Sequence, residues 1–326
     1  MSHLLTIQIL VKDNEDTIEF TLESVLPLIQ KLNAQLVIGD LGCTDRTIQK
    51  CNNYNAQIIR LSLNSNLSQA RNNLLEKSDC KWYFQIEPYE TILKGIDSIC
   101  SAVSAKDHIT YHANILQGDI ITKQIRLWHK DAKLKFKNPV FETLSGNATK
   151  TEIYIVRGEK DNSDLSLSLA SKWLESSPLL TEPLYYVAFA NLSKRNWTAF
   201  LNYAEMYLHQ EKNESMSVMM TRYYYSMVKC YIEKDYQSAI KSLLPCLANK
   251  PLMAEFWCLL GDIYYAIKQY DKSQCFYENA ILLGSRRLKD DDWQLEISKY
   301  KEYPQKMIER CKELKQSLRL YFGKNL

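Results

Sequence analysis

The sequence predicts an α/β domain with a mixed sheet, followed by an all-α domain of helical repeats. Three observations lead to this prediction. Over about the first sixty residues, short apolar runs alternate three times with helical segments, which is typical of a parallel sheet with helical crossovers. Several strand-like runs joined by polar turns follow and extend the sheet. Beyond residue 164 the patterns are helical only, and they repeat.

A cluster of charged and turn-forming residues separates the two parts. It covers residues 158–164 and reads GEKDNSD. Such a composition is typical of a connection between domains. We therefore predict two domains, residues 1–160 and residues 161–326, in a chain whose 326 residues are enough for both.

The composition argues against several classes of protein. Apolar residues make up 46% of the chain, which is enough for folded cores, and the net charge of +3 is too small to indicate a nucleic-acid-binding protein. The nine cysteines include no C-x-x-C pair, which favours reduced thiols in a cytoplasmic protein over disulfides or a zinc site. We expect neither a signal peptide nor a transmembrane segment, because no basic region precedes the first apolar run and no run is long enough.

The first apolar run, LTIQILV at residues 5–11, predicts a buried strand. It ends in a polar turn that contains Asp13, Asn14 and Glu15. A helix is predicted over residues 18–32, because apolar residues recur there on one helical face.

The second apolar run, at residues 36–38, predicts a strand that ends at Asp40. Open α/β sheets bind ligands at the carboxyl ends of their strands, so Asp40 is a candidate ligand-binding residue. Asp45 lies in the same loop, just before a helix predicted from Arg46 onward. Two interpretations of Asp45 stay open, a second ligand-binding carboxylate or the N-cap of that helix.

A third strand is predicted near residues 56–60, which completes the alternation. A polar loop follows, and then a helix that we expect Ser68 to cap. Arg71 lies in the first turn of that helix.

The next strand, at residues 81–86, is followed by two carboxylates. These are Glu87 and Glu90, and between them Pro88 lacks a backbone donor, so the strand cannot continue. Both carboxylates therefore belong to the ligand-binding edge of the sheet.

Four runs between residues 107 and 158 predict a mixed or antiparallel extension of this sheet. They are HITYHANIL, DIITKQIRLWH, LKFKNPVFETL and EIYIVRG. Tight polar turns such as Gln117-Gly118-Asp119 join them. The chemically interesting residues of the extension are Arg126, His129, Asn138 and Glu142.

The second domain contains a helical repeat of about 34 residues. Counted from Ala254, residues at the tetratricopeptide spacings W-x2-L-G-x2-Y and small, aromatic, small are Trp257, Leu260, Gly261, Tyr264, Ser273, Tyr277 and Ala280. The preceding copy contains Tyr223, Ala239, Leu243 and Pro251, and a looser copy spans about residues 181–212. About three such repeats bury a continuous core, and we expect a capping helix over about residues 293–322.

The first half resembles the glycosyltransferases of family 2, which have the GT-A fold, a Rossmann-like mixed sheet. Four segments carry the resemblance, namely KDNE with the following TLESV, GDLGCTDRT, ARN and WYFQIEPYE. They resemble the family's K-N-E with T-L-x-S-[LV], D-x-G-S-x-D-x-T, A-R-N and W-x-x-x-x-D-x-D-E. The resemblance covers roughly residues 4–158, and glycosyltransferases with tetratricopeptide-like repeats after the catalytic domain are similar in layout.

The resemblance implies a nucleotide-sugar donor, a UDP- or GDP-sugar. Asp40 is expected to bind its uracil or ribose, and Arg71 to contact its phosphates or support the loop. Glu87 stands at the first acid of D-x-D and is expected to bind a divalent metal, Mn2+ or Mg2+. The full set expected to bind the donor is Asp13, Asn14, Glu15, Asp40, Asp45, Arg71 and Glu87.

The sequence departs from the family pattern at two places. The D-x-D motif reads Glu87-Pro88-Tyr89, and tyrosine is a poor metal ligand at neutral pH. Phe141 stands where related sequences have a histidine before a glutamate, here Glu142. We expect Glu142 and Glu90 to be the catalytic carboxylates, with Glu142 as general base or acceptor-positioning residue and His129 as its alternative.

Two hypotheses for function follow. The first is an inverting hexosyltransferase-like enzyme whose repeats bind a protein, peptide or glycan acceptor or a second subunit, as in a homodimer. The second is a catalytically degenerate transferase that acts as a tetratricopeptide protein-interaction scaffold. A nucleotidyltransferase is a third, weaker alternative, because the Gly-rich basic loop that usually follows its first strand is absent.

Overall fold

The computed structural model describes residues 3–63, 66–78, 80–105, 109–159, 163–287 and 293–323. The chain divides into two compact units, Met1–Trp173 and Leu174–Leu326. The domain boundary predicted between residues 160 and 161 lies outside the described residues. Each unit is described by itself below.

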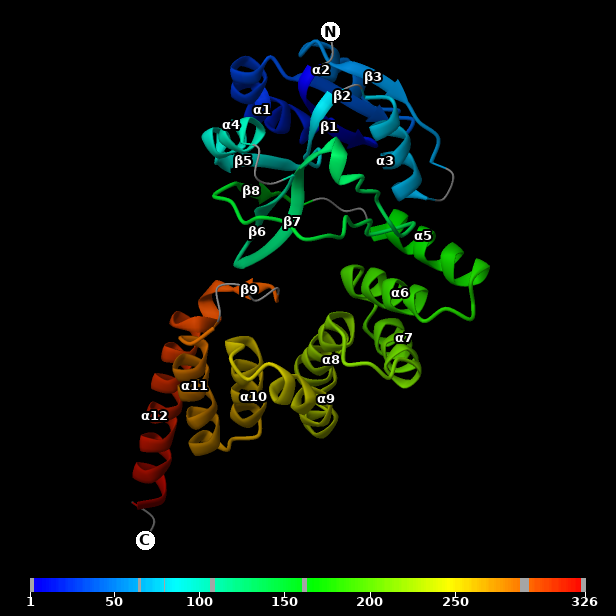
Figure 1. Ribbon diagram of the computed structural model, residues 1–326. Helices are drawn as coiled ribbons and strands as arrows, with labels where there is room; N and C mark the ends of the chain where they lie inside the picture. Colours follow the sequence, from blue (N-terminus) through cyan, green and yellow to red (C-terminus); the bar gives the residue numbers. More distant parts are fainter. Residues whose placement is uncertain are drawn as a thin grey trace. The chain divides into compact units, whose positions relative to one another are not determined.

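Eight strands of the first unit form one mixed sheet in the order β3-β2-β1-β4-β7-β6-β8-β5 (Figure 1). They are β1 (His3–Val11), β2 (Gln35–Asp40), β3 (Gln57–Arg60), β4 (Cys80–Gln85), β5 (Glu90–Lys94), β6 (Thr110–Gln117), β7 (Ile120–His129) and β8 (Tyr154–Arg157). Strands β3, β2, β1 and β4 are parallel neighbours, and β7 pairs with β4 in the antiparallel direction. The predicted α/β fold with a mixed sheet is confirmed.

Helices cover both faces of this sheet. They are α1 (Ile18–Leu32), α2 (Thr47–Asn52), α3 (Leu67–Glu76) and α4 (Ile96–Ser104). In β1, Ile7 and Ile9 belong to the core shared with α1 and α4, whereas Leu10 packs in a cluster with Ala70 of α3. Because alternate side chains of a strand point to opposite faces, one apolar strand supplies both layers of the core.

Three details of the first unit differ from the prediction. Helix α3 is capped by Asn66, whose side chain accepts a hydrogen bond from the Gln69 N–H, and not by Ser68. Strand β5 and helix α4 were not foreseen. Residues 134–144 form no strand, because Asn138 and Phe141 adopt positive φ angles of 71° and 50°, which interrupt an extended run.

The second unit consists of antiparallel helix pairs (Figure 1). The helices are α5 (Ser163–Ser176), α6 (Glu182–Ser193), α7 (Trp197–Gln210), α8 (Met216–Val228), α9 (Tyr236–Asn249), α10 (Ala254–Ala266), α11 (Tyr270–Gly284) and α12 (Glu302–Gly323). A π-helical turn, Lys229–Glu233, extends α8. The pairs α6/α7, α8/α9 and α10/α11 are tetratricopeptide-like, as predicted, whereas the capping helix begins at Glu302 and not near residue 293.

The last repeat shows why its small residues are needed. Gly261 of α10 lies against the ring of Tyr277 of α11, and a β-carbon at that glycine would be 2.5 Å from a ring atom. Ser273 donates a hydrogen bond to the Gly261 carbonyl over 2.8 Å. The missing side chain therefore lets the two helices approach closely.

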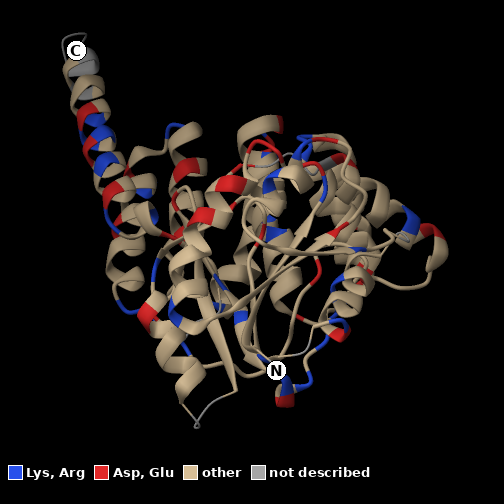
Figure 2. Ribbon diagram, turned by 90° about the horizontal axis from the view of Figure 1, so that it is seen from above, with Lys and Arg blue, Asp and Glu red and all other residues tan. Residues whose placement is uncertain are grey.

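Two surface properties complete the description. Figure 2 shows acidic and basic residues interleaved along α12, so this helix carries no stripe of one sign. Among the described helices, none combines the length and the apolar character needed to cross a membrane.

Candidate functional site

The predicted site residues of the first half lie at one edge of the sheet. The register pairs Val11 with Asp40 and Gln8 with Gln85. Because β1, β2 and β4 are parallel, the turn after β1, the loop after β2 and the segment after β4 all leave the sheet at this edge. Two groups of side chains meet there, one around Asp40 and one around Glu87.

The loop after β2 is organised by Asp40 itself. Its Oδ1 atom accepts hydrogen bonds from the backbone N–H groups of Gly42 (2.9 Å) and Cys43 (2.8 Å), and the residue is buried. Gly42 adopts a φ angle of +89°, which favours glycine. The loop therefore folds back over the end of its own strand.

The turn after β1 is fastened to this loop by carboxylates that accept backbone N–H groups. Asp13 Oδ1 accepts from Thr44 N–H (2.7 Å), and Glu15 Oε2 accepts from Arg46 N–H (3.0 Å). The hydrogen bond from Thr44 lowers the pKa of Asp13 to about 2, although burial opposes the shift. The hydrogen bond from Arg46 likewise lowers the pKa of Glu15.

Asp45 closes the same arrangement from the other side. One oxygen accepts from Thr47 N–H at the start of α2 and the other from Glu15 N–H, both over 2.9 Å. Burial opposes the ionisation of Asp45, but these hydrogen bonds outweigh it and lower the pKa. The capping interpretation of Asp45 thus corresponds to an observed contact, which also ties Asp45 to the turn after β1.

Asn14 has an unused hydrogen-bond donor. Its backbone N–H donates to Thr47 Oγ1 (2.6 Å) and its Oδ1 accepts from Lys12 N–H (2.8 Å). Its Nδ2 amide is buried and has no partner within the described part of the chain. A buried N–H group without a partner is costly, so this donor is a candidate contact for a bound ligand.

The second group is a cluster of three carboxylates and three guanidinium groups, which we call the Arg–Glu cluster. Its members are Arg71, Glu87, Glu90, Arg126, Glu142 and Arg157. Sequence reasoning singled out every member except Arg157. The last residue of a short strand, Arg157 carries no local sign that it will reach Glu90, a residue far away in the sequence.

Arg71 joins two of the carboxylates. Its Nη2 atom donates to both oxygens of Glu87, over 2.8 and 3.0 Å, and its Nε donates to Glu142 Oε1 over 2.6 Å. Burial opposes the ionisation of Glu87, but the charges of Arg71 and Arg126 outweigh it and lower the pKa of Glu87. The remaining oxygen of Glu142, Oε2, makes no hydrogen bond within the described residues.

The neighbour of Arg71 positions the loop that carries Glu142. Asn72 donates to the Phe136 carbonyl (3.0 Å) and accepts from the Phe136 N–H (2.9 Å). The backbone N–H of Leu67, at the start of α3, donates to the Pro139 carbonyl over 2.9 Å. Helix α3 therefore holds residues 134–144 in place although they form no strand.

Glu90 lies at the centre of the cluster and is fully buried. It accepts hydrogen bonds from Arg126 (2.8 Å) and Arg157 (2.9 Å), both at Oε1. Its other oxygen accepts from the backbone N–H of Glu87 over 2.9 Å. In this arrangement, Glu90 orients the guanidinium groups and the turn of Glu87.

The residues around Glu87 do not fit the divalent metal that the D-x-D motif implies. Both of its oxygens already accept from Arg71, and Gln85 donates to one of them as well. A dication about 4 Å from a guanidinium is repelled by roughly 8 kcal/mol at an effective dielectric constant of about 20. Tyr89 supplies no second carboxylate.

A second acidic group, Asp13, Cys43 and Asp45, brings its ligand atoms within 4.8 Å of one another. The carboxylates there already accept backbone N–H groups. Burial raises the pKa of the Cys43 thiol to about 11, so this sulfur is protonated at neutral pH and is a poor ligand.

His129 lies away from the cluster. It pairs with Trp82 near the start of β4, roughly 16 Å along the strand from Glu87 at the usual rise per residue. Its ring packs edge-on against Trp82, and Nδ1 contacts Asp131. Of the two alternatives, the structure therefore brings Glu142 and not His129 to the edge of the sheet with Asp40 and Glu87.

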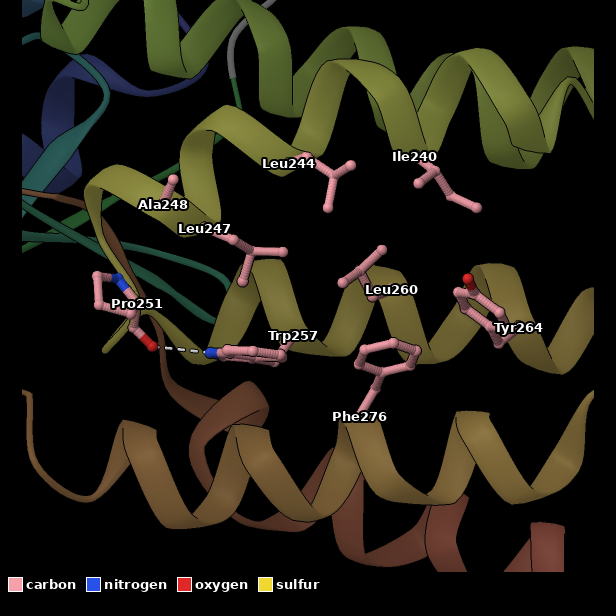
Figure 3. A pocket seen from close by; sticks show the side chains of 9 residues that line it. All are labelled: Ile240, Leu244, Leu247, Ala248, Pro251, Trp257, Leu260, Tyr264 and Phe276. Atoms are coloured by element: carbon pink, nitrogen blue, oxygen red, sulfur yellow. Dashed lines mark hydrogen bonds between the residues drawn. The ribbon is translucent and has the colours of Figure 1, made fainter.

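The second unit contains an apolar pocket of about 570 Å³ between α9, α10 and α11. Figure 3 shows Ile240 and Leu244 of α9 facing Leu260 and Phe276 across it. The other lining residues are Leu247, Ala248, Pro251, Trp257 and Tyr264. The indole N–H of Trp257 is used by the Pro251 carbonyl over 2.7 Å, so the pocket offers mainly apolar surface.

Comparison with known proteins agrees with the class of the first unit. The family model described as Glycosyl transferase family 2 matches residues 6–86, which include Asp13, Asp40 and Arg71. The resemblance of the first half to this family is thereby confirmed for that segment. Among curated proteins, none matches the chain.

Two solved structures illustrate the two parts. MamA 41-end from Desulfovibrio magneticus RS-1 shares 21% identity over 48% of this chain and 88% of its own, with a TM-score of 0.36. Glucosyl-3-phosphoglycerate synthase from Mycobacterium tuberculosis, in complex with Mn2+, uridine-diphosphate and phosphoglyceric acid, shares 15% over 36% of this chain and 44% of its own, with a TM-score of 0.30. At such TM-scores neither likeness bears on function.

The contacts of Asp13 lead to a prediction on pH dependence. Since its pKa is lowered in the folded state, its contribution to stability is present above about pH 4 and is lost as the pH falls toward 2. Solvent screens this partly exposed group, so the effect is small. Asp13→Asn should unfold at lower urea than the wild type at pH 7, and this difference should shrink as the pH is lowered.

Urea titrations between pH 7 and pH 3 measure the effect. Asp16→Asn is the matched control, because Asp16 is exposed and makes no hydrogen bond or ion pair within the described chain. Parallel stability curves for the wild type and Asp13→Asn would contradict the prediction.

Proposed function

We propose that the chain is a glycosyltransferase that moves a sugar from a nucleotide-sugar donor, a UDP- or GDP-sugar, to an acceptor with inversion at the anomeric carbon. The observation that carries this proposal is the pair of interlocked loops, residues 13–15 and 40–47, inside the segment that matches the family. The buried Asp40 and the unpartnered amide of Asn14 lie in these loops, and they supply an acceptor and a donor for a nucleoside.

The chemistry asks for a base at the acceptor, and Glu142 supports this role best. Arg71 fixes one of its oxygens, while the other is unoccupied by any described hydrogen-bond partner. That oxygen accepts the proton of the acceptor nucleophile as the nucleophile attacks the anomeric carbon and the nucleoside diphosphate leaves. Glu90, being fully buried, acts through Arg126 and Arg157.

The helical repeats are proposed to bind a polypeptide, either the acceptor or a second copy of the chain. The open apolar pocket between α9 and α10 supports this, because pockets of this size and lining accept apolar side chains. We further propose the cytoplasm as its compartment, since all nine cysteines lie within the described residues and are free thiols.

A second candidate function is a catalytically degenerate transferase that serves as a scaffold through its repeats. One observation favours it, which is that every carboxylate of the Arg–Glu cluster is ion-paired. The two functions differ in turnover, so an activity measurement separates them.

Nucleotide binding is the first test. UDP or GDP should raise the melting temperature of the full chain by several degrees at saturation, because a ligand that binds only the native state stabilises it. Asp40→Ala should abolish the shift. Asp97→Ala is the control, since Asp97 is an exposed residue of α4, and it should keep the shift. No shift with either nucleotide would overturn the proposal.

Turnover of the base variant is the second test. Glu142→Gln still accepts a hydrogen bond from Arg71 but cannot take a proton. We expect nucleoside diphosphate release from a nucleotide-sugar to fall by roughly 100-fold or more, with unchanged nucleotide affinity. If the wild type binds the nucleotide but releases nothing from a panel of nucleotide-sugars, with or without added peptides and glycans, the scaffold function is favoured.

Self-association through the pocket is the third test. Leu244 is 52% exposed at the pocket, so Leu244→Glu should leave the fold intact and weaken a dimer by roughly tenfold or more. Sedimentation velocity measures the dimer. Leu282→Glu is the matched control, because Leu282 is 54% exposed on α11 outside the pocket. A dimer that is unchanged in Leu244→Glu would exclude the pocket as its interface.

A further inference from the structure

Arg71 takes the position at Glu87 that a cation takes in a chelating carboxylate. A single nitrogen, Nη2, lies 2.8 and 3.0 Å from the two oxygens of Glu87. The Arg71 side chain is only 9% exposed, and Nε binds Glu142 on its other side. The guanidinium is therefore held by two carboxylates from different parts of the chain, as a structural cation would be.

The charges of the Arg–Glu cluster balance without a metal ion. Three guanidinium groups face three carboxylates, and Arg126 lies 3.6 Å from Glu87 in addition to its contact with Glu90. A guanidinium stays protonated at all physiological pH values, so its positive charge is permanent. The cluster thus supplies fixed positive charge where a D-x-D site binds a dication to obtain it.

The same guanidinium keeps donors for an anion. Arg71 uses Nε and Nη2 for carboxylates, whereas Nη1 has no hydrogen-bond partner within the described residues. Nη1 is also not among the buried nitrogens that lack a partner, so it reaches solvent. Arg157 is 22% exposed at the same cluster. Planar guanidinium forks match the oxygens of a phosphate.

We infer that this chain binds the diphosphate of its donor without a divalent cation, with Arg71 of the Arg–Glu cluster in the place of the metal. The inference rests on the proposed function, because it concerns how the same site holds a nucleoside diphosphate. When the bond between the anomeric carbon and the leaving phosphate oxygen breaks, negative charge develops on that oxygen. The N–H groups of Arg71 at Nη1 stabilise this charge by hydrogen bonding.

The test compares nucleotide affinity with and without metal. UDP and GDP are titrated by calorimetry into the full-length wild type, in excess EDTA and again in Mn2+. We expect affinities that agree within about twofold, since no cation takes part. In Arg71→Gln, affinity in EDTA should fall by roughly tenfold or more, the loss expected for a charge-assisted hydrogen bond.

The same variant gives a second signature. Without the Arg71 charge, Glu87 and Glu142 are released to bind a dication, so Mn2+ should restore part of the affinity of Arg71→Gln. A variant that is merely misfolded shows no such rescue. Arg222→Gln is the matched control, an ion-paired arginine of the second unit that should keep wild-type affinity.

The outcomes distinguish this inference from the function on which it rests. Wild-type binding in Mn2+ but not in EDTA would overturn the inference and leave the transferase proposal standing. Wild-type affinity of a folded Arg71→Gln in EDTA would also overturn the inference. No binding of either nucleotide under both conditions would overturn the proposed function together with it. The comparison on the wild type decides even if Arg71→Gln does not fold.

Discussion

The double ion pair of Arg71 with Glu87 and Glu142 is the interaction on which the candidate site depends. It joins three segments that are remote in sequence, namely helix α3, the end of β4 and residues 134–144. Each partner is buried, so the loss of one charge would leave the others without compensation. The sheet brings these segments to a common edge, but this guanidinium fixes their positions relative to one another.

The two halves of the edge are stabilised by different means. Around Asp40, carboxylates accept backbone N–H groups of neighbouring loops, which fixes the loop shape through local hydrogen bonds. Around Glu87, side-chain charges of opposite sign neutralise one another, and few backbone groups take part. The first arrangement forms a rigid rim for a nucleoside, and the second forms an electrostatic floor for phosphates.

The sequence predicted the sheet and its functional edge well, because both follow from local patterns. The apolar runs of β1, β2 and β4 and the residues just after them define which side chains meet, including Asp40 and Glu87. Partnerships across the fold were not predictable, since nothing near Arg71 in the sequence indicates that it will bind Glu142. Residues 134–144 were predicted as a strand from alternating apolar residues such as Phe136, which is indeed buried, although positive φ angles prevent the extended conformation.

Asn72 has a consequence for how the two sides of the site can change. Its side-chain amide satisfies both the N–H and the carbonyl of Phe136, as the backbone of a neighbouring strand would do. The segment that carries Glu142 is thus attached to the domain at a few points and does not contribute a strand to the sheet. Insertions or deletions between these attachment points would alter the acceptor side without shifting the register of any strand, so acceptor preference can diversify while the nucleotide side stays as it is.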